Sequence, residues 1–324
     1  MYKNIVGQAI AIIIPCYNEA STICKVVSDF KAVLPEAQIY VYDNNSNDNT
    51  AIIARDAGAI VKREYQQGKG NVIRTMFSQI EADVYLMVDG DDTYPSESAK
   101  ELIQPIIDGI ADMTIGDRLS NGTYTQENKR TFHNFGNSLV RFSINHFFNG
   151  NLNDIMTGYR GFSRKFVKNF PVMCGGFELE TEMSLHALDK RFPIIQVPVV
   201  YRDRPEGSYS KLNTIRDGFR VLSTIFNMFK DYRPMVFFGL IAFFLFLLGL
   251  ASGYPVVIEY ARVKYITHVP LAVLASGLEI SSIIFFACGL ILDTIVNANK
   301  REYEWKLIQY ETRRRSCNAN IHCR

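Results

Sequence analysis

The sequence is poor in several features that mark particular classes of protein. It has one tryptophan in 324 residues and a formal net charge of only +2. This balance, without a basic patch that carries interleaved aromatics, argues against nucleic-acid binding. The six cysteines show no Cys-x-x-Cys spacing, which argues against a zinc site or a disulfide framework and favours free thiols. No internal repeat or low-complexity tract occurs, and the length of 324 residues suits one large or two modest domains.

Long apolar runs are confined to the C-terminal part. The run at 9–14 has only six residues, too few for a secretory signal, and predicts a buried strand. Residues 235–258 carry no charge and residues 269–292 carry only Glu279, and about 20 apolar residues cross a bilayer core. We therefore expect two transmembrane helices within 234–296, because the apolar neighbours of Glu279 outweigh its cost of up to ~3 kcal/mol.

Cationic side chains flank these two predicted spans. The segments at 211–233 and 300–315 carry more Lys and Arg than the loop at 259–268 between the spans. The positive-inside rule therefore predicts a multi-pass protein of the cell (inner or plasma) membrane whose N-terminal domain and both termini are cytoplasmic, with a cytoplasmic tail at 297–324. Within 213–233, apolar residues recur at spacings of four and three, which predicts an amphipathic juxtamembrane helix at the membrane interface.

Before the spans, short apolar runs alternate with amphipathic stretches. This alternation predicts an α/β domain over residues 1–212, with a doubly wound, mostly parallel sheet. Polar residues that could cap a first turn place helix starts at Ser21, at 47–50 and at Ser96. The expected elements are strands at 9–14, 39–42, 59–61, 84–88, 113–115 and 194–201, and helices at 135–148 and 180–188 in the more irregular second half.

One expected strand leads directly into a cluster of aspartates. The apolar run at 84–88 ends in Asp89-Gly90-Asp91-Asp92, and open α/β sheets bind ligands at the carboxyl ends of their strands. Asp89 and Asp91 could ligate one hard divalent ion and leave positions for phosphate oxygens. An isolated Asp-x-Asp is more often a surface turn, so this prediction depends on the rest of the chain.

Three further polar loops should open at the same sheet edge. Pro15-Cys16-Tyr17-Asn18-Glu19 follows the first strand, the Asn-rich segment 43–50 follows the second, and Gly68-Lys69-Gly70-Asn71 precedes a helix. Taken singly, segment 43–50 fits a turn and a helix cap equally well. Together the loops predict a nucleoside cradle, in which Asp43 accepts a base or ribose proton and Lys69 meets phosphate charge.

In this order and spacing, Pro-x-Tyr-Asn-Glu, Asp-Asn-x-Ser-x-Asp-x-Thr, Gly-Lys-Gly and Asp-Gly-Asp resemble the family-two inverting glycosyltransferases of GT-A fold. Downstream segments resemble the polyprenyl-phosphate branch, which includes dolichol-phosphate mannose synthase and bacterial undecaprenyl-phosphate sugar transferases. These segments are Gly116-Asp117-Arg118, Lys129-Arg130, Asp154, Thr157-Gly158-Tyr159-Arg160, Gly176-Phe177-Glu178, Tyr201-Arg202-Asp203-Arg204, Gly207-Ser208 and Ser210-Lys211. The likeness covers residues 9–213, and the two spans that follow resemble those of the bacterial enzymes.

The resemblance implies roles for individual residues. The nucleotide-sugar site would comprise Pro15, Tyr17, Asn18, Glu19, Asp43, Asn44, Lys69, Asp89, Gly90, Arg202 and Lys211. The lipid phosphate would be held by Arg118, Arg130 and Asn134, and the catalytic residues would be Asp91, Asp154 and Glu178. Asp89 and Asp91 would bind Mg²⁺ or Mn²⁺. Asn134 stands where the family often has a small hydroxyl residue, and Thr93 replaces a glutamine seen in several relatives.

The chemistry implied is transfer of one sugar, with inversion, from a nucleotide sugar to undecaprenyl or dolichyl phosphate, with a UDP-sugar favoured. A phosphate monoester has a second pKa near ~6 and hardly needs a general base. Asp154 and Glu178 would therefore orient the phosphate, the ring hydroxyls or an arginine, and a structural ion pair is an equal alternative for each. The lipid-linked product would serve envelope or protein glycosylation, with a flippase, a downstream glycosyltransferase and a second copy of the chain as candidate partners.

Three other readings compete with this one. A sugar-phosphate nucleotidyltransferase would need a glycine-rich loop after the first strand, where this chain has Pro15. A processive polysaccharide synthase commonly has a Gln-x-x-Arg-Trp motif, whereas Trp305 lies beyond both spans. A catalytically silent membrane scaffold that binds nucleotide sugar is the third reading, and the intact acidic and basic positions argue against it.

Overall fold

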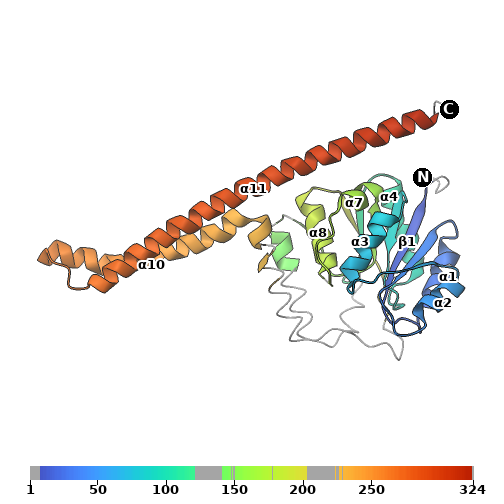
Figure 1. Cartoon of the computed structure of the whole chain (residues 1–324), viewed down its shortest axis with the longest axis horizontal. Coiled ribbons are helices and arrows are strands. Elements are labelled where there is room, and N and C mark those ends of the chain that lie inside the picture. Colours follow the sequence, from blue (N-terminus) through green and yellow to red (C-terminus); the bar gives the residue numbers. More distant parts are fainter. Residues whose placement is uncertain are drawn as a thin grey trace. The chain divides into compact units, whose positions relative to one another are not determined.

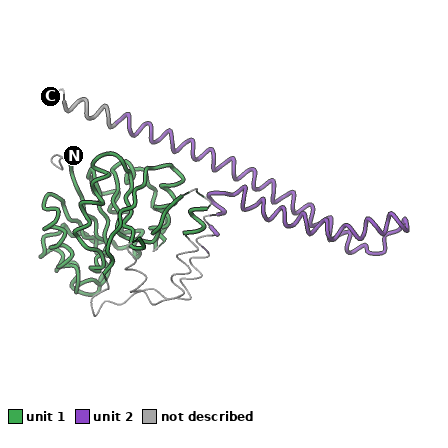
Figure 2. Tube along the Cα trace, turned by 180° about the vertical axis from the view of Figure 1, so that it is seen from behind, with its two compact units in different colours: residues 1–221 green, residues 222–324 purple. Residues whose placement is uncertain are grey.

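The computed structural model describes residues 8–120, 141–146, 148, 150–176, 178–202, 223, 226–227 and 229–322. The chain divides into two compact units, Met1–Val221 and Leu222–Arg324 (Figure 2). The first is the α/β unit and the second is built from two long helices.

A seven-stranded sheet forms the centre of the first unit, with the strand order β3-β2-β1-β4-β6-β5-β7. The strands are β1 (Ile10–Cys16), β2 (Gln38–Asp43), β3 (Ile60–Arg63), β4 (Val84–Met87), β5 (Met113–Asp117), β6 (Arg160–Ser163) and β7 (Ile194–Pro198). Only β6 runs antiparallel to its neighbours, β4 and β5. The expected mostly parallel sheet is confirmed, and so are all six strands expected from the sequence.

Helices cover both faces of this sheet (Figure 1). They are α1 (Ile23–Val33), α2 (Thr50–Asp56), α3 (Lys69–Gln79), α4 (Ala99–Ile107), α7 (Arg164–Asn169), α8 (Leu179–Asp189) and the short 3₁₀ turn η1 (Ser96–Ser98). Helices α1 and α4 pack on the face that carries Ile12 and Ile14. On the opposite face Phe77 of α3 contacts Phe162 of β6, which stacks on Phe166 of α7. Each fully buried large apolar side chain stabilises the unit by roughly 1.5–3 kcal/mol.

The helix starts agree with expectation, and in the 47–50 cluster Asp48 accepts from the Thr50 N–H at 3.1 Å, but the N-cap residues of α1 and α2 make no side-chain capping bond. Helix α1 begins at Ile23, two residues after Ser21, and its N-cap Thr22 makes no side-chain capping bond. The Thr22 hydroxyl donates instead to the carbonyl oxygen of Gly90 at 2.6 Å. The Asn49 side chain likewise does not cap α2. Polar residues there tie loops to one another, a competing use of the same hydrogen-bonding groups.

Strand β6 and helix α7 were not expected from the sequence. Strand β6 has only four residues, begins with an arginine and contains a glycine, so it lacks an apolar run. Arg160 is nevertheless fully buried. Its guanidinium donates to the carbonyl oxygens of Thr157 and Ile155 and to the Ser184 hydroxyl, at 2.9, 2.5 and 2.9 Å. These bonds satisfy the buried guanidinium, and they hold the segment before β6 in place.

The second unit contains α10 (Pro234–Val263) and α11 (Val269–His322), with 30 and 54 residues. The two helices pack together, and the Ser282 hydroxyl of α11 donates to the carbonyl oxygen of Ala242 in α10 at 2.8 Å. At 1.5 Å per residue, α10 measures about 45 Å, more than the ~30 Å hydrocarbon core of a bilayer. Both helices are long and apolar enough to cross a membrane, as expected, and α11 continues well beyond its predicted span.

Two predicted helices fall only partly within the described residues. Of 135–148, the structure describes 141–146 and residue 148, which are helical. Of the amphipathic helix at 213–233, it describes Ser223, 226–227 and 229–233, which are helical through Tyr232. The membrane-interface role of that helix stays a prediction.

Candidate functional site

The carboxyl ends of β1, β2 and β4 bring four acidic side chains around one buried thiol. Cys16 ends β1 and lies opposite Asp43 in the parallel register with β2. Burial raises the pKa of the Cys16 thiol, and Glu19, Asp43, Asp89 and Asp91 raise it further through their negative charge. The four carboxylates, contributed by three separate loops, therefore share one electrostatic environment, as the sequence predicted for this edge.

Hydrogen bonds join the loop after β1 to the loop after β2. The Asn18 N–H donates to the Ser46 hydroxyl at 2.9 Å, and the Asn18 side-chain oxygen accepts from the Asn47 N–H at 2.8 Å. The Glu19 N–H donates to the Thr50 hydroxyl at 2.9 Å. Asn18 has a φ of +53°, a left-handed conformation that asparagine adopts more readily than most residues. The Asn18 and Glu19 backbone is thus fixed before any ligand arrives.

Two other predicted residues of the first loop lie at the sheet edge. Pro15 is the sixth residue of β1 and lies opposite Tyr42 of β2. Tyr17, the next residue but one, is partly exposed. The roles predicted for Pro15 and Tyr17 at the nucleotide stay predictions.

Asp43 has an unsatisfied oxygen inside the protein. Its side chain is buried, and among the described residues its Oδ1 has no hydrogen-bond partner. The other oxygen accepts from the Ser46 N–H at 3.3 Å. A buried acceptor without a partner costs about 1–3 kcal/mol, so this oxygen favours a ligand that brings an N–H or O–H donor.

Asn44 is predicted at the nucleotide, and its side chain forms hydrogen bonds to the neighbouring loop. Its amide nitrogen donates to the carbonyl oxygens of Glu64 and Gln66 at 3.0 and 2.8 Å. Its oxygen accepts from the Gly68 N–H at 2.7 Å. Asn44 therefore fixes the loop that carries Lys69 to the edge of β2.

Lys69 bridges two carboxylates. Its ammonium lies 2.5 Å from Asp89 Oδ1 and 2.6 Å from Glu180 Oε1. Burial opposes the charged form of Lys69, but Asp89 and Glu180 outweigh it and hold the pKa of Lys69 above its ordinary value. Glu180 was missed from the sequence, where Glu178 was chosen. Only the α8 register, which leaves Glu178 partly exposed and buries Glu180, separates the two.

Two glycines permit the close approach of the aspartate loop to its surroundings. A Cβ on Gly90 would lie 2.8 Å from Cys16 Sγ, and a Cβ on Gly158 would lie 2.3 Å from Asp89 Oδ2. Real Cβ atoms are not found so close. Gly90 therefore allows the aspartate loop to pack closely against the end of β1, and Gly158 allows its backbone to pack closely against the Asp89 carboxylate.

Thr93 forms hydrogen bonds to both Asp91 and Arg202. Asp91 is buried, and its Oδ1 accepts from the Thr93 hydroxyl at 2.7 Å. The Arg202 N–H donates to the Thr93 carbonyl oxygen at 3.0 Å, which places β7's exit loop against the aspartate loop. The exposed Arg202 guanidinium lies 3.3 Å from Glu97. Thr93, which stands in place of a glutamine, thus orients Asp91.

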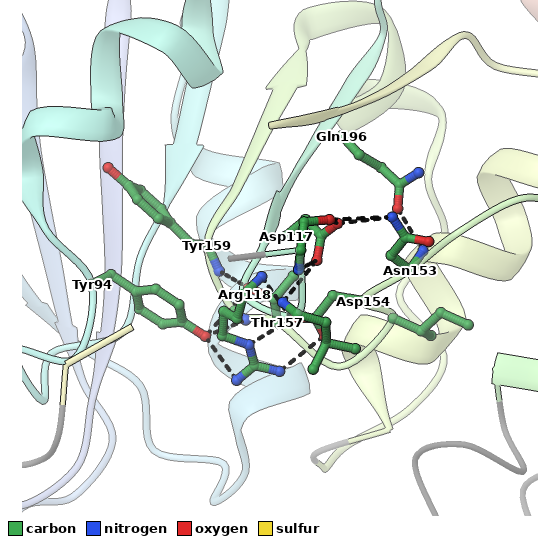
Figure 3. Close-up of polar contacts among 12 residues, drawn as sticks. Tyr94, Asp117, Arg118, Asn153, Asp154, Thr157, Tyr159 and Gln196 are labelled. Atoms are coloured by element: carbon green, nitrogen blue, oxygen red, sulfur yellow. Dashed lines mark hydrogen bonds and ion pairs between the residues drawn. The ribbon is translucent and has the colours of Figure 1, made fainter. Parts of the chain in front are cut away.

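Arg118 and Asp154 form a buried bidentate ion pair (Figure 3). The Asp154 oxygens accept from Nε and Nη2 of Arg118 at 2.6 and 2.9 Å. The Tyr94 hydroxyl lies 3.4 Å from Arg118 Nη1 and accepts from the Gly158 N–H at 3.1 Å. This pair fits both an Asp154 that orients an arginine and the structural ion pair that the sequence left as an equal alternative, so the catalytic role of Asp154 stays a prediction. Tyr94 is a further member of this cluster that the sequence did not single out.

A second polar cluster, centred on Asp117 and Asn153, lies next to this pair in the sequence and in the fold. Burial disfavours ionisation of Asp117, but hydrogen bonds from Ser120, Asn153 and the Leu119 N–H outweigh it and lower the pKa of Asp117. The side-chain amide of Asn153 donates to the Asp117 carboxylate at 2.9 Å. The backbone N–H of Asn153 donates to the side-chain oxygen of Gln196 in β7 at 2.6 Å (Figure 3). The cluster joins the end of β5 to the middle of β7 beside the Asp154 loop.

Four predicted site residues remain, of which the structure describes only Glu178. Glu178 is the partly exposed N-cap residue of α8. Arg130, Asn134 and Lys211 lie outside the described residues. Their roles, and that of Glu178, stay predictions.

A divalent ion suits the donor set of Asp89 and Asp91. Within the described ranges, no group of three or more His, Cys, Asp or Glu side chains is arranged to hold a metal ion. Mg²⁺ is commonly held by one or two carboxylates together with substrate phosphates and water, so two carboxylates meet that requirement. The Lys69 ammonium already lies on Asp89, which shows that this carboxylate accepts a cation.

Comparison with known proteins identifies the family. The model of the family described as "Glycosyl transferase family 2" matches residues 11–170. Glycosyltransferase AglJ of Haloferax volcanii is 31% identical over 299 residues, which cover 91% of this chain and 96% of that protein. A protein of the same organism named dolichyl-phosphate hexose transferase is 25% identical over 224 residues, 69% of this chain and 95% of that protein.

A solved structure gives the same fold. Glucosyl-3-phosphoglycerate synthase from Mycobacterium tuberculosis, in complex with Mn²⁺, UDP-glucose and phosphoglyceric acid, aligns with a TM-score of 0.52 at 18% identity, over 68% of this chain and 79% of that one. The alignment supports the GT-A architecture expected from the sequence. With a relative matched along nearly its whole length and the aspartate loop at the expected sheet edge, the chain belongs to glycosyl transferase family 2 and is a glycosyltransferase.

Proposed function

We propose that this enzyme transfers a single sugar from a nucleotide sugar, UDP-linked by preference, to a polyprenyl phosphate at the cytoplasmic face of the membrane, with inversion at the anomeric carbon. The observation that carries the proposal is the buried, unsatisfied Asp43 Oδ1 beside the Asp89 and Asp91 carboxylates. An unsatisfied acceptor suits the N–H of a nucleobase, and the two carboxylates suit a cation that binds a diphosphate.

The donor half of the site rests on residues of the first three loops. Asp43 would accept the imide N–H of uracil, and Asp89 and Asp91 would hold Mg²⁺ or Mn²⁺. When bound, the ion would neutralise charge on the leaving nucleoside diphosphate. Arg202, held against Thr93 by its backbone, has an exposed guanidinium suited to the same diphosphate. The complex of the structurally similar synthase with Mn²⁺ and UDP-glucose supports this choice of donor and ion.

The acceptor half needs fixed cations more than a base. A lipid phosphate is already ionised near pH 7, and both Asp154 oxygens are engaged by Arg118. Asp154 would therefore keep the Arg118 guanidinium in place, and Arg130 and Asn134 would complete the phosphate site. A phosphate oxygen would form the new bond to the anomeric carbon as the bond to the diphosphate oxygen breaks, and the nucleoside diphosphate would leave.

The membrane assignment rests on α10 and α11. Two helices long enough to cross a bilayer would keep the catalytic unit near its lipid acceptor, with both termini cytoplasmic. The relative named dolichyl-phosphate hexose transferase supports a polyprenyl-phosphate acceptor. The product would carry its sugar on the cytoplasmic leaflet, so a flippase and a downstream glycosyltransferase would follow in the reaction sequence.

The test is transfer of label from radiolabelled UDP- and GDP-sugars to an organic-extractable lipid, using the full chain, polyprenyl phosphate and Mg²⁺ or Mn²⁺, with an EDTA control. We expect one donor to give labelled lipid, and Asp91→Asn to lower turnover at least about 100-fold. Asp56→Asn, an exposed aspartate at the end of α2, is the matched control. No lipid product from any donor with folded enzyme, or a fully active Asp91→Asn variant, would refute the proposal.

A further inference from the structure

Lys69 and Glu180 form a largely buried pair of opposite charges in the described site, and Lys69 also contacts the predicted metal ligand Asp89. The side chains of Lys69, Glu180 and Asp89 are 11%, 7% and 28% exposed. One ammonium is thus shared between a carboxylate of the aspartate loop and a carboxylate of α8. The proposed function accounts for Asp89, and the sequence predicts that Lys69 meets phosphate charge, but neither gives Glu180 a role.

The position of Lys69 is set by a close backbone contact. A Cβ on Gly68 would lie 2.0 Å from the Gly175 carbonyl oxygen, and one on Gly70 would lie 2.1 Å from the Cys174 carbonyl oxygen. The Gly70 N–H donates to the Gly175 carbonyl oxygen at 3.3 Å. The start of α3 is therefore held against the segment that leads into α8, which fixes the Lys69 backbone close to α8.

Glu180 is itself held in place by the interior of the unit. Its backbone carbonyl oxygen accepts from the Ser184 hydroxyl at 2.9 Å, and that hydroxyl accepts from the buried Arg160 at 2.9 Å. The negative charge of Glu180 also favours the charged form of Arg160. Glu180 is a fixed anchor, whereas Asp89 lies on a more exposed loop.

A divalent ion and the Lys69 ammonium compete for Asp89. Both are cations, and Asp89 Oδ1 is 2.5 Å from Lys69 Nζ, so an ion that approaches Asp89 repels the ammonium. Glu180 offers Lys69 a second carboxylate on which to remain. Without that carboxylate, Asp89 would be the nearest anion for a buried ammonium, which would hold Asp89 more strongly against the ion.

We propose that Glu180 is a positioning residue that retains Lys69 beside the donor site and thereby sets how readily a divalent ion displaces Lys69 from Asp89. After displacement, Lys69 stays on Glu180 and presents its charge to the nucleoside diphosphate. This inference rests on the proposed donor site at Asp89 and Asp91.

Mn²⁺ binding to the full chain in detergent, measured by electron paramagnetic resonance with and without UDP, tests the inference independently of turnover. Without UDP, Glu180→Gln should weaken Mn²⁺ binding and Lys69→Met should tighten it, each at least about fivefold. In the Lys69→Met background, Glu180→Gln should no longer weaken binding, because no ammonium is left to compete. Glu81→Gln, which breaks the Lys168–Glu81 pair elsewhere in the unit, is the matched control and should leave Mn²⁺ affinity unchanged.

The outcomes separate this inference from the function on which it rests. If wild-type enzyme binds Mn²⁺ but Glu180→Gln binds it equally well or more tightly, the role of Glu180 is wrong and the donor site stands. The same conclusion follows if Glu180→Gln still weakens binding after Lys69 is removed. If wild-type enzyme binds no Mn²⁺ even with UDP, the proposed donor site is wrong and this inference fails with it. If Lys69→Met does not fold, Lys69→Gln supplies the same uncharged background for the comparison with Glu180→Gln.

Discussion

The buried pair of Arg118 and Asp154 allows a quantitative prediction about stability. Both side chains are essentially inaccessible, at 8% and 0% exposed, and two hydrogen bonds join them. Asp154→Asn keeps the shape but removes the charge that neutralises Arg118. Removing one partner of a buried ion pair costs about 3–5 kcal/mol, because the other charge is left without compensation. For a unit of about 200 residues, each kcal/mol corresponds to about 2–4 °C, so we expect the melting temperature to fall by about 10 °C.

Thermal denaturation of the full chain in detergent, followed by circular dichroism, measures this effect. The double variant Arg118→Met with Asp154→Leu removes both charges and should be clearly more stable than Asp154→Asn, because apolar replacement of a whole buried pair is often neutral. Glu81→Gln, which removes a mostly exposed carboxylate from its contact with Lys168, is the control and should change stability by less than about 1 kcal/mol. A melting temperature for Asp154→Asn within about 2 °C of wild type would show that Arg118 does not depend on Asp154.

Two further predictions concern nucleotide binding and pH. Asp43→Ala removes the unsatisfied buried acceptor and should weaken UDP binding by about 1–3 kcal/mol, measured by isothermal titration calorimetry; unchanged affinity would contradict a nucleobase contact at Asp43. Burial lowers the pKa of His186 to about 4, so below about pH 6.5 the unfolded chain takes up a proton that the folded unit excludes, and stability should fall as the pH drops from 6.5 towards 4. His186→Leu, which keeps an apolar group against Phe166 and Phe192, should flatten that dependence in pH-resolved melts, and an equally steep slope in the variant would rule His186 out as its source.

The sheet and the aspartate edge could be predicted because their signals are local. Buried parallel strands read as continuous apolar runs, so β1, β2 and β4 could be recognised from the sequence, and the loops that follow them meet at one edge. Strand β6 gave no such signal, because it has no continuous apolar run, and its buried arginine, satisfied by nearby carbonyl oxygens and by Ser184, looks like a surface residue in sequence.

Partners of polar side chains were harder to predict than their positions. Lys69 was expected to meet phosphate, yet in the protein alone it binds Asp89 and Glu180, which lies 111 residues away. Asn44 is predicted at the nucleotide, a role that stays a prediction, and its amide holds the loop at Glu64. Spacing in the sequence identifies which loops converge, but the choice among neighbouring donors and acceptors depends on the tertiary packing of segments far apart in the chain.

The place of β6 in the sheet has a consequence for biosynthesis. Both neighbours of β5, which are β6 and β7, come after it in the chain, so a growing polypeptide exposes Met113–Asp117 as an unpaired strand until residue 163 has left the ribosome. Strands β1 to β4 can associate much earlier, because they pair among themselves. The unit should therefore fold in two stages, with a half-sheet whose open β4 edge is vulnerable to aggregation. Chains truncated between β5 and β6 should depend on chaperones or be degraded, even though they carry the entire aspartate loop.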